Sequence, residues 1–447
     1  MEVQSNRLFS IPDWVVLDHQ IFPKDLDSFR NNAVTSAEVC ASNSELVRVS
    51  FILSALPGTS RLCVHLKEGH ELSCLDTVVA AHGKAVLFRL KVDFEGLTGK
   101  AIDYFIYWAY TSGPKLSLVP RYYSTVKEIA AAEEGSWRRR LRYRMANYRG
   151  IGLLLTGDSE EFVVAELRLN LSKLEDDVDA PLEGELFRLR SDGAGAAGEW
   201  EVKNTSVRDG KPTFRDIHGW WEAHKVVPYA RYLCWVDYYR GVIFCDVNND
   251  NPELQYLALP VGYVLPGYPV PFRSVLPQVF RAVCITKDET MKFINVVHDD
   301  SFPMVSAGSS FTIVISTLVH DYDEMRWQED LKIESHELWE MEGYDDQLPR
   351  IAPLFPLMSV DNPNIIYFVL RERKTLDAGA KTCVVTLDMV NKKVLSYKDI
   401  KAIPEEDPVM ASYNIFLNVP FFPSEFSKHL QKAAPMKKKE SQEVIGC

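Results

Sequence analysis

The stretch Tyr232-Leu-Cys-Trp-Val-Asp-Tyr-Tyr-Arg-Gly-Val-Ile-Phe-Cys-Asp-Val247 decides the fold, and it leads into Leu257-Ala-Leu-Pro260. Two apolar runs rich in aromatic and β-branched residues flank a short polar break at Arg240-Gly241. This pattern predicts a β-hairpin in which Gly241 supplies the positive φ of the turn, because glycine adopts that conformation without steric cost. The hairpin is the local unit from which the rest of the chain can be interpreted.

Within this hairpin, the alternation of Leu233 with Trp235 is typical of a strand with half-buried faces. Asp237 and Asp246 stand at strand ends, where a carboxylate can accept hydrogen bonds from nearby backbone N–H groups and hold a turn. Trp235, Asp237, Gly241 and Asp246 are therefore predicted to be structural residues. A ligand site around Trp235 and Asp237 is the alternative that the residue types leave open.

Short apolar runs separated by turn residues continue on both sides, from about residue 46 to residue 400. They include Val47–Ser54, Ala85–Val92, Phe162–Leu169, Phe311–Val319 and Thr382–Asp388. Their total is on the order of two dozen strands, which predicts an all-β architecture. Helical periodicity is scarce, and Ser124–Tyr148 is the main helical candidate.

A weak internal repeat of strand, polar turn and strand begins at residues 186, 242, 311 and 382, at intervals of 56, 69 and 71 residues. Propeller blades repeat at about 40–50 residues plus loop insertions. Two dozen strands at four per blade predict a β-propeller of about six blades. Unrelated hairpins in a sandwich or in a two-domain β protein remain the alternative, because the period is irregular.

The predicted organisation has three parts. Residues 1–45 form an N-terminal extension, residues 46–400 form the propeller-like domain, and residues 401–447 form a C-terminal segment. That last segment ends in the polar run Ala433-Ala-Pro-Met-Lys-Lys-Lys-Glu-Ser-Gln-Glu443. A run of this composition is expected to be a disordered tail.

Composition and charge exclude several classes of protein. The 447 residues are 46% hydrophobic and 25% charged, with a net charge of −12, which is ordinary for a globular protein. The negative field disfavours binding to nucleic acid, and no apolar run is long enough for a membrane helix. Residues 1–7 contain one basic residue and are followed by no apolar run, so we expect no signal peptide. The eight cysteines lack metal-site spacing. We therefore expect mostly free, buried thiols in a cytoplasmic or nuclear protein, not a secreted one.

The chain has no recognisable catalytic motif. It lacks a P-loop and a G-x-S-x-G nucleophile elbow, and His336-Glu337 is followed by Glu340 where a zinc-protease helix needs its second histidine. We therefore expect no catalytic residues, no metal and no cofactor. Catalysis by residues far apart in the sequence stays open, although a non-enzymatic role is favoured.

The hairpin from Trp235 to Val247, followed by Leu257-Ala-Leu-Pro260, resembles the signature of the plant domain-of-unknown-function family 1618, which is expanded in grasses. The resemblance extends to Trp14–Asp18, Phe162–Leu167 and Leu186–Val202, and so covers about residues 11 to 400. The same cadence is similar to the kelch-like propellers attached to plant F-box proteins, but the N-terminus lacks an F-box. The resemblance implies a plant cell and a propeller-like fold, and it implies no activity.

A propeller without catalytic motifs is most often a rigid interaction platform, so this is the predicted function. The alternative is a small-molecule or carbohydrate-binding protein, or an enzyme, that uses the central channel.

One basic stretch, Trp137–Arg149, stands out in the acidic chain. Its guanidinium groups suit an acidic partner protein better than a polyanionic nucleic acid. The predicted partner-binding residues are Arg138, Arg139, Arg140, Arg142 and Arg144, and a solvated structural loop is the competing interpretation.

Overall fold

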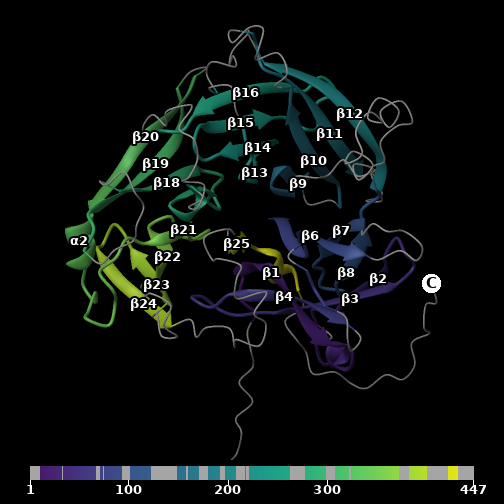
Figure 1. The fold of residues 1–447 in the computed structure, drawn as a ribbon, viewed down its shortest axis with the longest axis horizontal. Coiled ribbons are helices and arrows are strands. Elements are labelled where there is room, and N and C mark those ends of the chain that lie inside the picture. Colours follow the sequence, from purple (N-terminus) through teal and green to yellow (C-terminus); the bar gives the residue numbers. More distant parts are fainter. Residues whose placement is uncertain are drawn as a thin grey trace, which may run out of the picture. The chain divides into compact units, whose positions relative to one another are not determined.

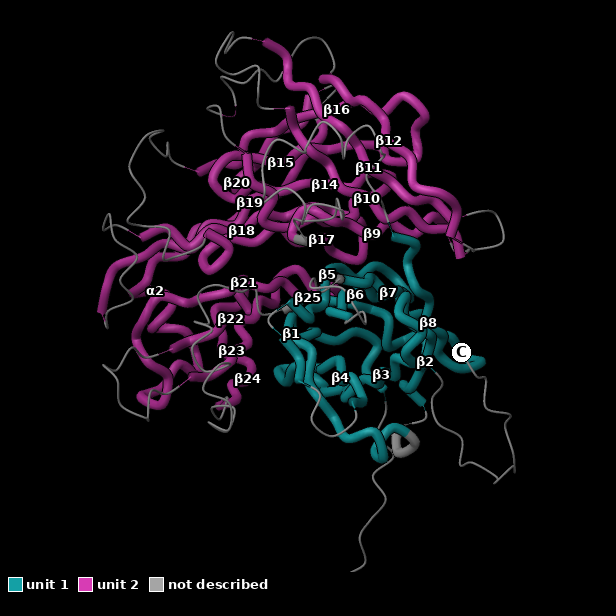
Figure 2. Tube along the Cα trace, turned by 45° about the vertical axis from the view of Figure 1, so that its right-hand side comes forward, with its two compact units in different colours: residues 1–146, 421–447 teal, residues 147–420 magenta. Residues whose placement is uncertain are grey.

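The structure is a computed structural model of the chain. It describes residues 11–32, 34–66, 71–73, 75–92, 101–121, 148–157, 160–170, 180–191, 197–207, 217, 221–261, 277–298, 308–321, 324–371, 382–399 and 421–430. The chain divides into two compact units (Figure 2). Unit 1 comprises residues 1–146 and 421–447, and unit 2 comprises residues 147–420.

Unit 1 is built on a nine-stranded sheet whose main path runs β2-β3-β4-β1-β5-β6-β7-β8, with β25 paired to β1. The strands are β1 (Val15–Asp25), β2 (Ala37–Cys40), β3 (Leu46–Ile52), β4 (Ser60–Leu66), β5 (Thr77–His82), β6 (Ala85–Val92), β7 (Ala101–Trp108), β8 (Lys115–Leu118) and β25 (Phe421–Ser424). Two 3-10 helices, η1 (Leu26–Asn32) and η8 (Phe426–His429), complete it. The end strands β2 and β8 contact each other, so the sheet curves back on itself.

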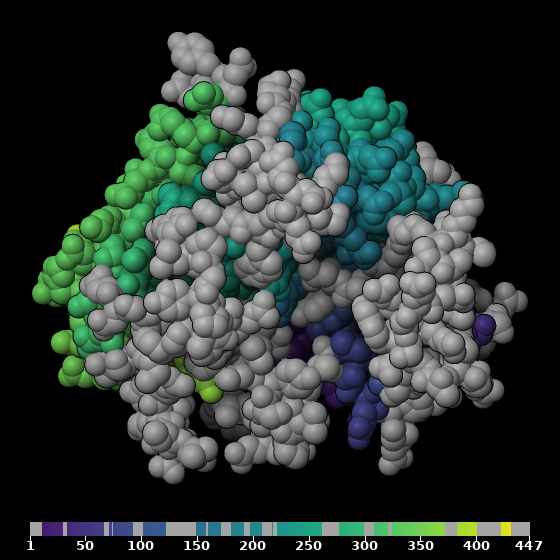
Figure 3. All heavy atoms as spheres, turned by 45° about the horizontal axis from the view of Figure 1, so that its top comes forward, coloured from purple at the N-terminus to yellow at the C-terminus, as the bar shows by residue number. Residues whose placement is uncertain are grey.

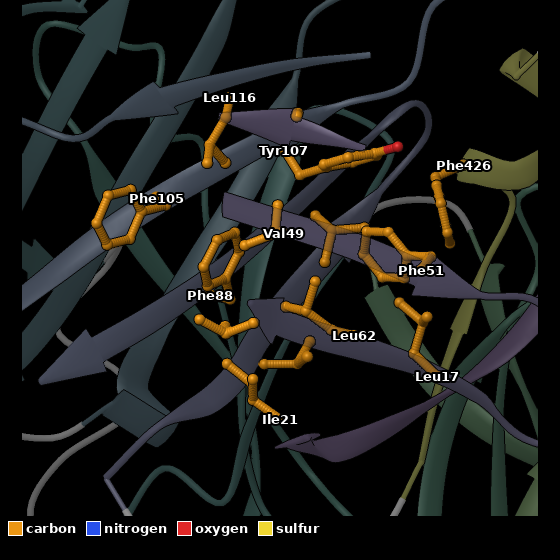
Figure 4. Close-up of a cluster of buried hydrophobic side chains, with 14 of the residues drawn as sticks. Leu17, Ile21, Val49, Phe51, Leu62, Phe88, Phe105, Tyr107, Leu116 and Phe426 are labelled. Atoms are coloured by element: carbon orange, nitrogen blue, oxygen red, sulfur yellow. The ribbon is translucent and has the colours of Figure 1, made fainter. Parts of the chain in front are cut away.

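The core of unit 1 contains aromatic rings both from its early strands and from the C-terminal η8 (Figure 4). The ring of Phe51 on β3 lies 4.7 Å from that of Tyr107 on β7 and 4.5 Å from that of Phe426 on η8. Buried aromatic side chains contribute large apolar areas and directional ring contacts. The C-terminal segment is thereby anchored in the same core as the N-terminal strands.

Unit 2 contains sixteen strands in its described residues, arranged in four successive antiparallel meanders of four strands each (Figure 1). The first two meanders are β9 (Ile151–Leu155), β10 (Phe162–Leu169), β11 (Glu183–Ser191), β12 (Ala197–Val207), and β13 (Lys225–Tyr229), β14 (Tyr232–Asp237), β15 (Gly241–Cys245), β16 (Glu253–Ala258). The last two are β17 (Arg281–Ile285), β18 (Met291–His298), β19 (Phe311–Asp321), β20 (Glu324–Glu334), and β21 (Leu354–Met358), β22 (Ile365–Arg371), β23 (Thr382–Asp388), β24 (Lys393–Asp399). The 3-10 helices η3 (Tyr148–Gly150) and η6 (Pro277–Val279) precede β9 and β17, and the α-helix α2 (Ser335–Trp339) follows β20.

The four first strands of these meanders follow one another in space. Contacts join β9 to β13, β13 to β17 and β17 to β21, while β12 pairs with β16 in parallel to fuse the first two meanders into an eight-stranded sheet. Repeated four-stranded meanders with neighbouring first strands are the organisation of propeller blades. Unit 1 adds two further four-stranded groups, β1–β4 and β5–β8. The predicted all-β, propeller-like fold is thus confirmed.

The weak sequence repeat corresponds to real structural units. Its four copies begin at β11, β15, β19 and β23, which are the third strands of the four meanders of unit 2, and each copy runs into the fourth strand. The intervals differ mainly because the segment between the second and third strands varies in length: it spans residues 238–240 in the second meander, 299–310 in the third and 372–381 in the fourth. The repeat therefore marked the outer half of each meander.

The predicted domain boundaries do not coincide with the two units. β1 and β2 lie in the expected N-terminal extension, yet both are strands of the first sheet, and β25 and η8 lie in the expected C-terminal segment. The strand register explains this, since β1 pairs with β4, β5 and β25. The helical candidate at residues 124–148 and the polar tail after residue 430 lie largely or wholly outside the described residues.

The edge strand β20 is protected by charge. Seven of its eleven side chains are exposed (Figure 3, green). They are Glu324, Arg326, Gln328, Glu329, Asp330, Lys332 and Glu334. Charged side chains along an exposed edge disfavour pairing with another chain.

In the described part of the molecule, no helix has the length and apolar character needed to cross a membrane.

The cysteines agree with the expected reduced thiols, with one exception. Five described cysteines are free and buried: Cys63, Cys234, Cys245, Cys284 and Cys383. Cys40 is disulfide-bonded, which the sequence pattern did not predict. Burial raises the pKa of the Cys245 thiol to about 12, so this group behaves as an inert core residue.

Candidate functional site

The hairpin predicted from the sequence is formed by β14 and β15, with Asp237 opposite Gly241 at its closed end. Its side chains are buried on both faces, not half-buried as the alternation suggested, because another layer of unit 2 covers each face. Trp235 belongs to one apolar cluster and Val236 to a second. The indole Nε1 of Trp235 donates a hydrogen bond of 2.8 Å to the carbonyl of Gly150, which ties the hairpin to η3.

Asp237 is a buried carboxylate that organises the turn. Its Oδ1 accepts a hydrogen bond of 2.9 Å from the Tyr239 N–H, and its Oδ2 accepts one of 3.1 Å from the Glu222 N–H. Burial raises the pKa of Asp237 to about 6, although these two N–H bonds and the charge of Arg240 favour the ionised form. The predicted bonding of this carboxylate to nearby backbone is confirmed.

His224 lies against this carboxylate, with its Nδ1 3.5 Å from Asp237 Oδ1. The same Nδ1 accepts a hydrogen bond of 3.3 Å from the Tyr238 N–H, which requires a lone pair on that nitrogen and hence a neutral ring. Burial lowers the pKa of His224 to about 3, and the positive charges of Arg149 and Arg281 add to this effect. The pair is therefore a buried carboxyl group beside a neutral imidazole.

The two groups impose opposite pH dependences on stability. The folded pKa of Asp237 is above its unfolded value, so its contribution to the free energy of unfolding falls as pH rises from about 4 to 6. The folded pKa of His224 is below its unfolded value, so its contribution to the free energy of unfolding rises as pH rises from about 3 to 6.5. Asparagine at position 224 keeps an acceptor for Tyr238 and does not titrate. We expect the stability advantage of the wild type over His224→Asn to grow by up to about 1.4 kcal/mol per pH unit between pH 4 and 6. Urea unfolding at several pH values checks this, and a constant difference would contradict it.

Gly241 has a physical role different from the one predicted. Its φ is not positive; instead a Cβ at this position would overlap Cε2 of Tyr256 and would lie 2.5 Å from the carbonyl oxygen of Leu257. The expected positive φ is therefore wrong, because the turn residues Tyr238–Arg240 reverse the chain before Gly241 enters β15. Glycine is required here by the close approach of β16.

Asp246 lies at the opposite end of the hairpin from Asp237, just after Cys245, whose register partner is Leu233. Its Oδ1 accepts a hydrogen bond of 3.2 Å from the Asn248 N–H, and its Oδ2 lies 3.5 Å from Nε of Arg231. Asp246 therefore holds the β15–β16 turn, as predicted. The two aspartates are not brought together, so they do not form an acid–base pair.

Arg188 on β11 is a buried arginine that holds two parts of unit 2 together, and the sequence patterns did not predict this role. It is 0% exposed, and its Nε donates a hydrogen bond of 2.9 Å to Glu201, its neighbour across the β11–β12 pair. Its Nη1 donates to the carbonyls of Val247 at 2.7 Å and Asn249 at 2.5 Å. Arg188 thus clamps the first meander of unit 2 to the β15–β16 turn of the second. An arginine inside the apolar run Leu186–Leu189 was the available signal.

The pKa of Glu201, the carboxylate partner of Arg188, depends on both its burial and the charges around it. Burial acts to raise the pKa of Glu201, but the hydrogen bond and charge of Arg188, together with Arg190 and Lys203, hold it below its usual value. Glu201 is therefore ionised at neutral pH, and the contact is a charge-assisted pair.

Unit 1 contains a serine–histidine pair with the spacing of a nucleophile and its base. His65 Nε2 lies 2.8 Å from Ser50 Oγ, and His65 Nδ1 lies 3.0 Å from the Asp25 carbonyl. Ser50 is 0% exposed and His65 is 4% exposed, so a substrate has no access to this hydroxyl. The pair acts as a satisfied internal hydrogen-bond network. In the described ranges, no three His, Cys, Asp or Glu side chains are grouped to hold a metal ion.

Hydrogen bonds link turns of neighbouring meanders in unit 2. Asn248 of the β15–β16 turn reaches Thr156 after β9 at 3.5 Å, and the Lys287 N–H of the β17–β18 turn donates to the Val360 carbonyl of the β21–β22 turn at 3.0 Å. Tyr229 at the end of β13 lies 3.3 Å from His320 near the end of β19. We call the exposed residues of these turns and of the β23–β24 turn the turn face of unit 2; they are Thr156, Gly157, Ala230, Arg231, residues 249–251, residues 287–289, Asp361, Asn362, Asn364 and residues 390–392. The predicted partner-binding residues Arg138, Arg139, Arg140, Arg142 and Arg144 lie outside the described residues.

A comparison with protein families places the decisive hairpin at the start of a recognised region. The family described as Protein of unknown function (DUF1618) matches residues 235–367, which begin at Trp235 and end in β22. The resemblance to DUF1618 is confirmed. The DUF1618 region contains the Asp237 turn, Gly241 and the complete β17–β20 meander. The plant origin and the kelch-like relationship remain predictions.

No curated protein matches the sequence. Among solved structures, the WD40 domain of SCAP from fission yeast is similar with a TM-score of 0.31 and 11% identity, over 86% of each chain. Xylan beta-1,4-xylosidase from Bacillus Halodurans C-125 has a TM-score of 0.27 and 9% identity, over 83% of each chain. An endo-arabinase from Bacteroides thetaiotaomicron VPI-5482 has a TM-score of 0.23 and 8% identity, over 56% of this chain and 81% of its own. At these scores, none of the three bears on what this protein binds.

Proposed function

We propose that the protein is a non-catalytic protein-interaction platform and that the turn face of unit 2 is its contact surface. The observation that supports this proposal is that the turns are exposed but individually locked. Asp388 accepts a hydrogen bond of 2.9 Å from the Asn391 N–H, and Asn362 accepts one of 3.0 Å from the Asn364 N–H. Asp246 and Asn249 lock the β15–β16 turn in the same way. A surface already held in one shape loses little conformational entropy when a partner binds.

The turn face also carries an apolar anchor. Val390, in the β23–β24 turn, is 59% exposed. Asn391 and Lys392 beside it are polar and exposed. An exposed apolar side chain with a polar rim is the local composition of a protein-binding surface. Arg188 and Asp237, two buried polar side chains of the unit, are used for internal hydrogen bonds.

Two further parts of this proposal rest on the sequence. We propose an acidic protein as a partner because of Arg138, Arg139, Arg140, Arg142 and Arg144, which lie outside the described residues. We propose a reducing compartment, the cytoplasm or nucleus, because five described cysteines are free and buried, although the Cys40 disulfide is an exception.

The test is affinity capture of partners by the full chain and matched variants. The turn-face variant is Glu289→Lys with Val390→Lys. The control, Glu329→Lys with Val297→Lys, makes the same two types of change on exposed positions of the β17–β20 sheet. We expect partners captured by the wild type and the control to be lost from the turn-face variant. In a third variant the five arginines are changed to serine. Partners that this variant loses, and that the turn-face variant keeps, bind through the basic segment and not through the turn face. If the turn-face variant captures the same partners as the control, the turn face is not the contact surface.

A further inference from the structure

Lys225 occupies an unusual place for a lysine. It is the first residue of β13, where the register pairs it with Val236 of β14. Side chains two residues apart along a strand share a face, so Lys225 lies on the face of Val227. Val227 and Val236 belong to an apolar cluster with Val283 of β17. The lysine stem therefore enters the apolar layer between the second and third meanders of unit 2.

Among the described residues, no carboxylate pairs with the ammonium group of Lys225. It makes no hydrogen bond and no ion pair with any residue that the structure describes. Two other lysines of the unit are paired with a carboxylate: Lys292 with Asp330 at 3.0 Å and Lys392 with Glu337 at 2.8 Å. Lys225 is half-buried, so solvent reaches part of the residue.

Its titratable surroundings are neutral. Cys284 on β17 interacts with Lys225, and burial raises the pKa of that thiol. Tyr238, in the same apolar cluster as Val236, carries no negative charge at neutral pH because burial raises its pKa too. Burial lowers the pKa of Lys225 itself. A larger fraction of this amine is therefore unprotonated at neutral pH than of a surface lysine.

We propose that Lys225 is a reactive amine that captures small apolar aldehydes or ketones as an imine. The nitrogen lone pair attacks the carbonyl carbon and forms the new C–N bond. The two amine hydrogens leave with the carbonyl oxygen as water, so no oxidant or reductant is needed. An unprotonated lysine in apolar surroundings is the form of the side chain that undergoes this reaction. The site differs from the turn face and does not depend on the proposed function.

The test is reductive labelling of the full chain with propanal and sodium cyanoborohydride, read by mass spectrometry at each lysine. The references are Lys332 and Lys398, which are exposed. Lowering the pKa of a lysine raises its unprotonated fraction at pH 7. We expect Lys225 to be labelled faster than either reference at pH 7. The advantage should shrink towards pH 10.5, where all lysines are largely unprotonated, and should vanish in urea.

Two variants separate the amine from its surroundings. Lys225→Arg should lose the fast label while the reference lysines keep their rates. Cys284→Ala should keep the fast label, which shows that the adduct forms on nitrogen and not on the thiol. If native Lys225 is labelled no faster than Lys332 and Lys398 at pH 7, or if its advantage does not change with pH, the proposal is wrong.

Discussion

Replacing Arg188 with methionine is expected to destabilise the protein by about 3 kcal/mol. The substitution removes the buried guanidinium group that pairs with Glu201. It also leaves the carbonyls of Val247 and Asn249 without the donor that Arg188 provides. Removing one partner of a buried charged network costs more than the network contributes net, because desolvated groups stay unpaired. Urea unfolding followed by tryptophan fluorescence measures the loss.

Arg190→Met is the matched control for this variant. Arg190 lies two residues further along β11 and contacts the same acidic groups, Glu201 at 2.9 Å and Asp250 at 3.5 Å, but its side chain is 39% exposed. Exposed ion pairs contribute about 0–1 kcal/mol, so this substitution should have a small effect. If both variants lost the same free energy of unfolding, the burial of Arg188 would not make its contacts more stabilising than those of Arg190.

Replacing Gly241 with valine is expected to cost at least about 3 kcal/mol. Its side chain would overlap the ring of Tyr256 and the backbone of Leu257, which belong to the neighbouring strand β16 and have little room to move. Overpacking a well-filled core costs about 1–3 kcal/mol, and displacement of the strand adds to it. Thermal unfolding measured by circular dichroism reports the effect.

Gly157→Ala separates this steric effect from backbone strain. Gly157 has a φ of +64°, and no atom outside its immediate chain neighbours lies within 4 Å of the position that a Cβ would occupy, so its substitution tests conformational strain alone. That strain costs about 1 kcal/mol. Gly241→Ala should cost more than Gly157→Ala, because the methyl group already meets Tyr256. A smaller loss at Gly241 would mean that β15 and β16 separate easily.

β10, β19 and β23 of unit 2 are among the strands that sequence patterns located most closely. β19 and β23 are long, rich in β-branched residues and bounded by polar turns, so local composition suffices to identify them. The predicted runs did not include β5, β13 or β21. β5 contains two alanines, and β13 and β21 each contain a proline, so their strand propensity is low. They form strands because neighbouring meanders bury them.

Individual site residues show the same division. The hydrogen bonds of Asp237 and Asp246 connect residues close in sequence, and a pattern of aspartates at strand ends predicted them. Arg188 binds residues about 60 positions away, in a turn that no local pattern links to β11. Lys225 was not singled out either, since its lack of a partner is visible only where β13 meets β17.

By itself, the sequence determined that the protein is all-β, that its strands come in short meanders, and that the Trp235 hairpin with its aspartate-held turns is a structural unit. These features depend on side-chain alternation, strand propensity and hydrogen bonds between near neighbours. Only the tertiary structure decided that β1 and β25 pair, that Gly241 is required by space and not by φ, and that Arg188 is a buried clamp. Each of these depends on which distant strands approach one another, and that is set by the packing of whole sheets.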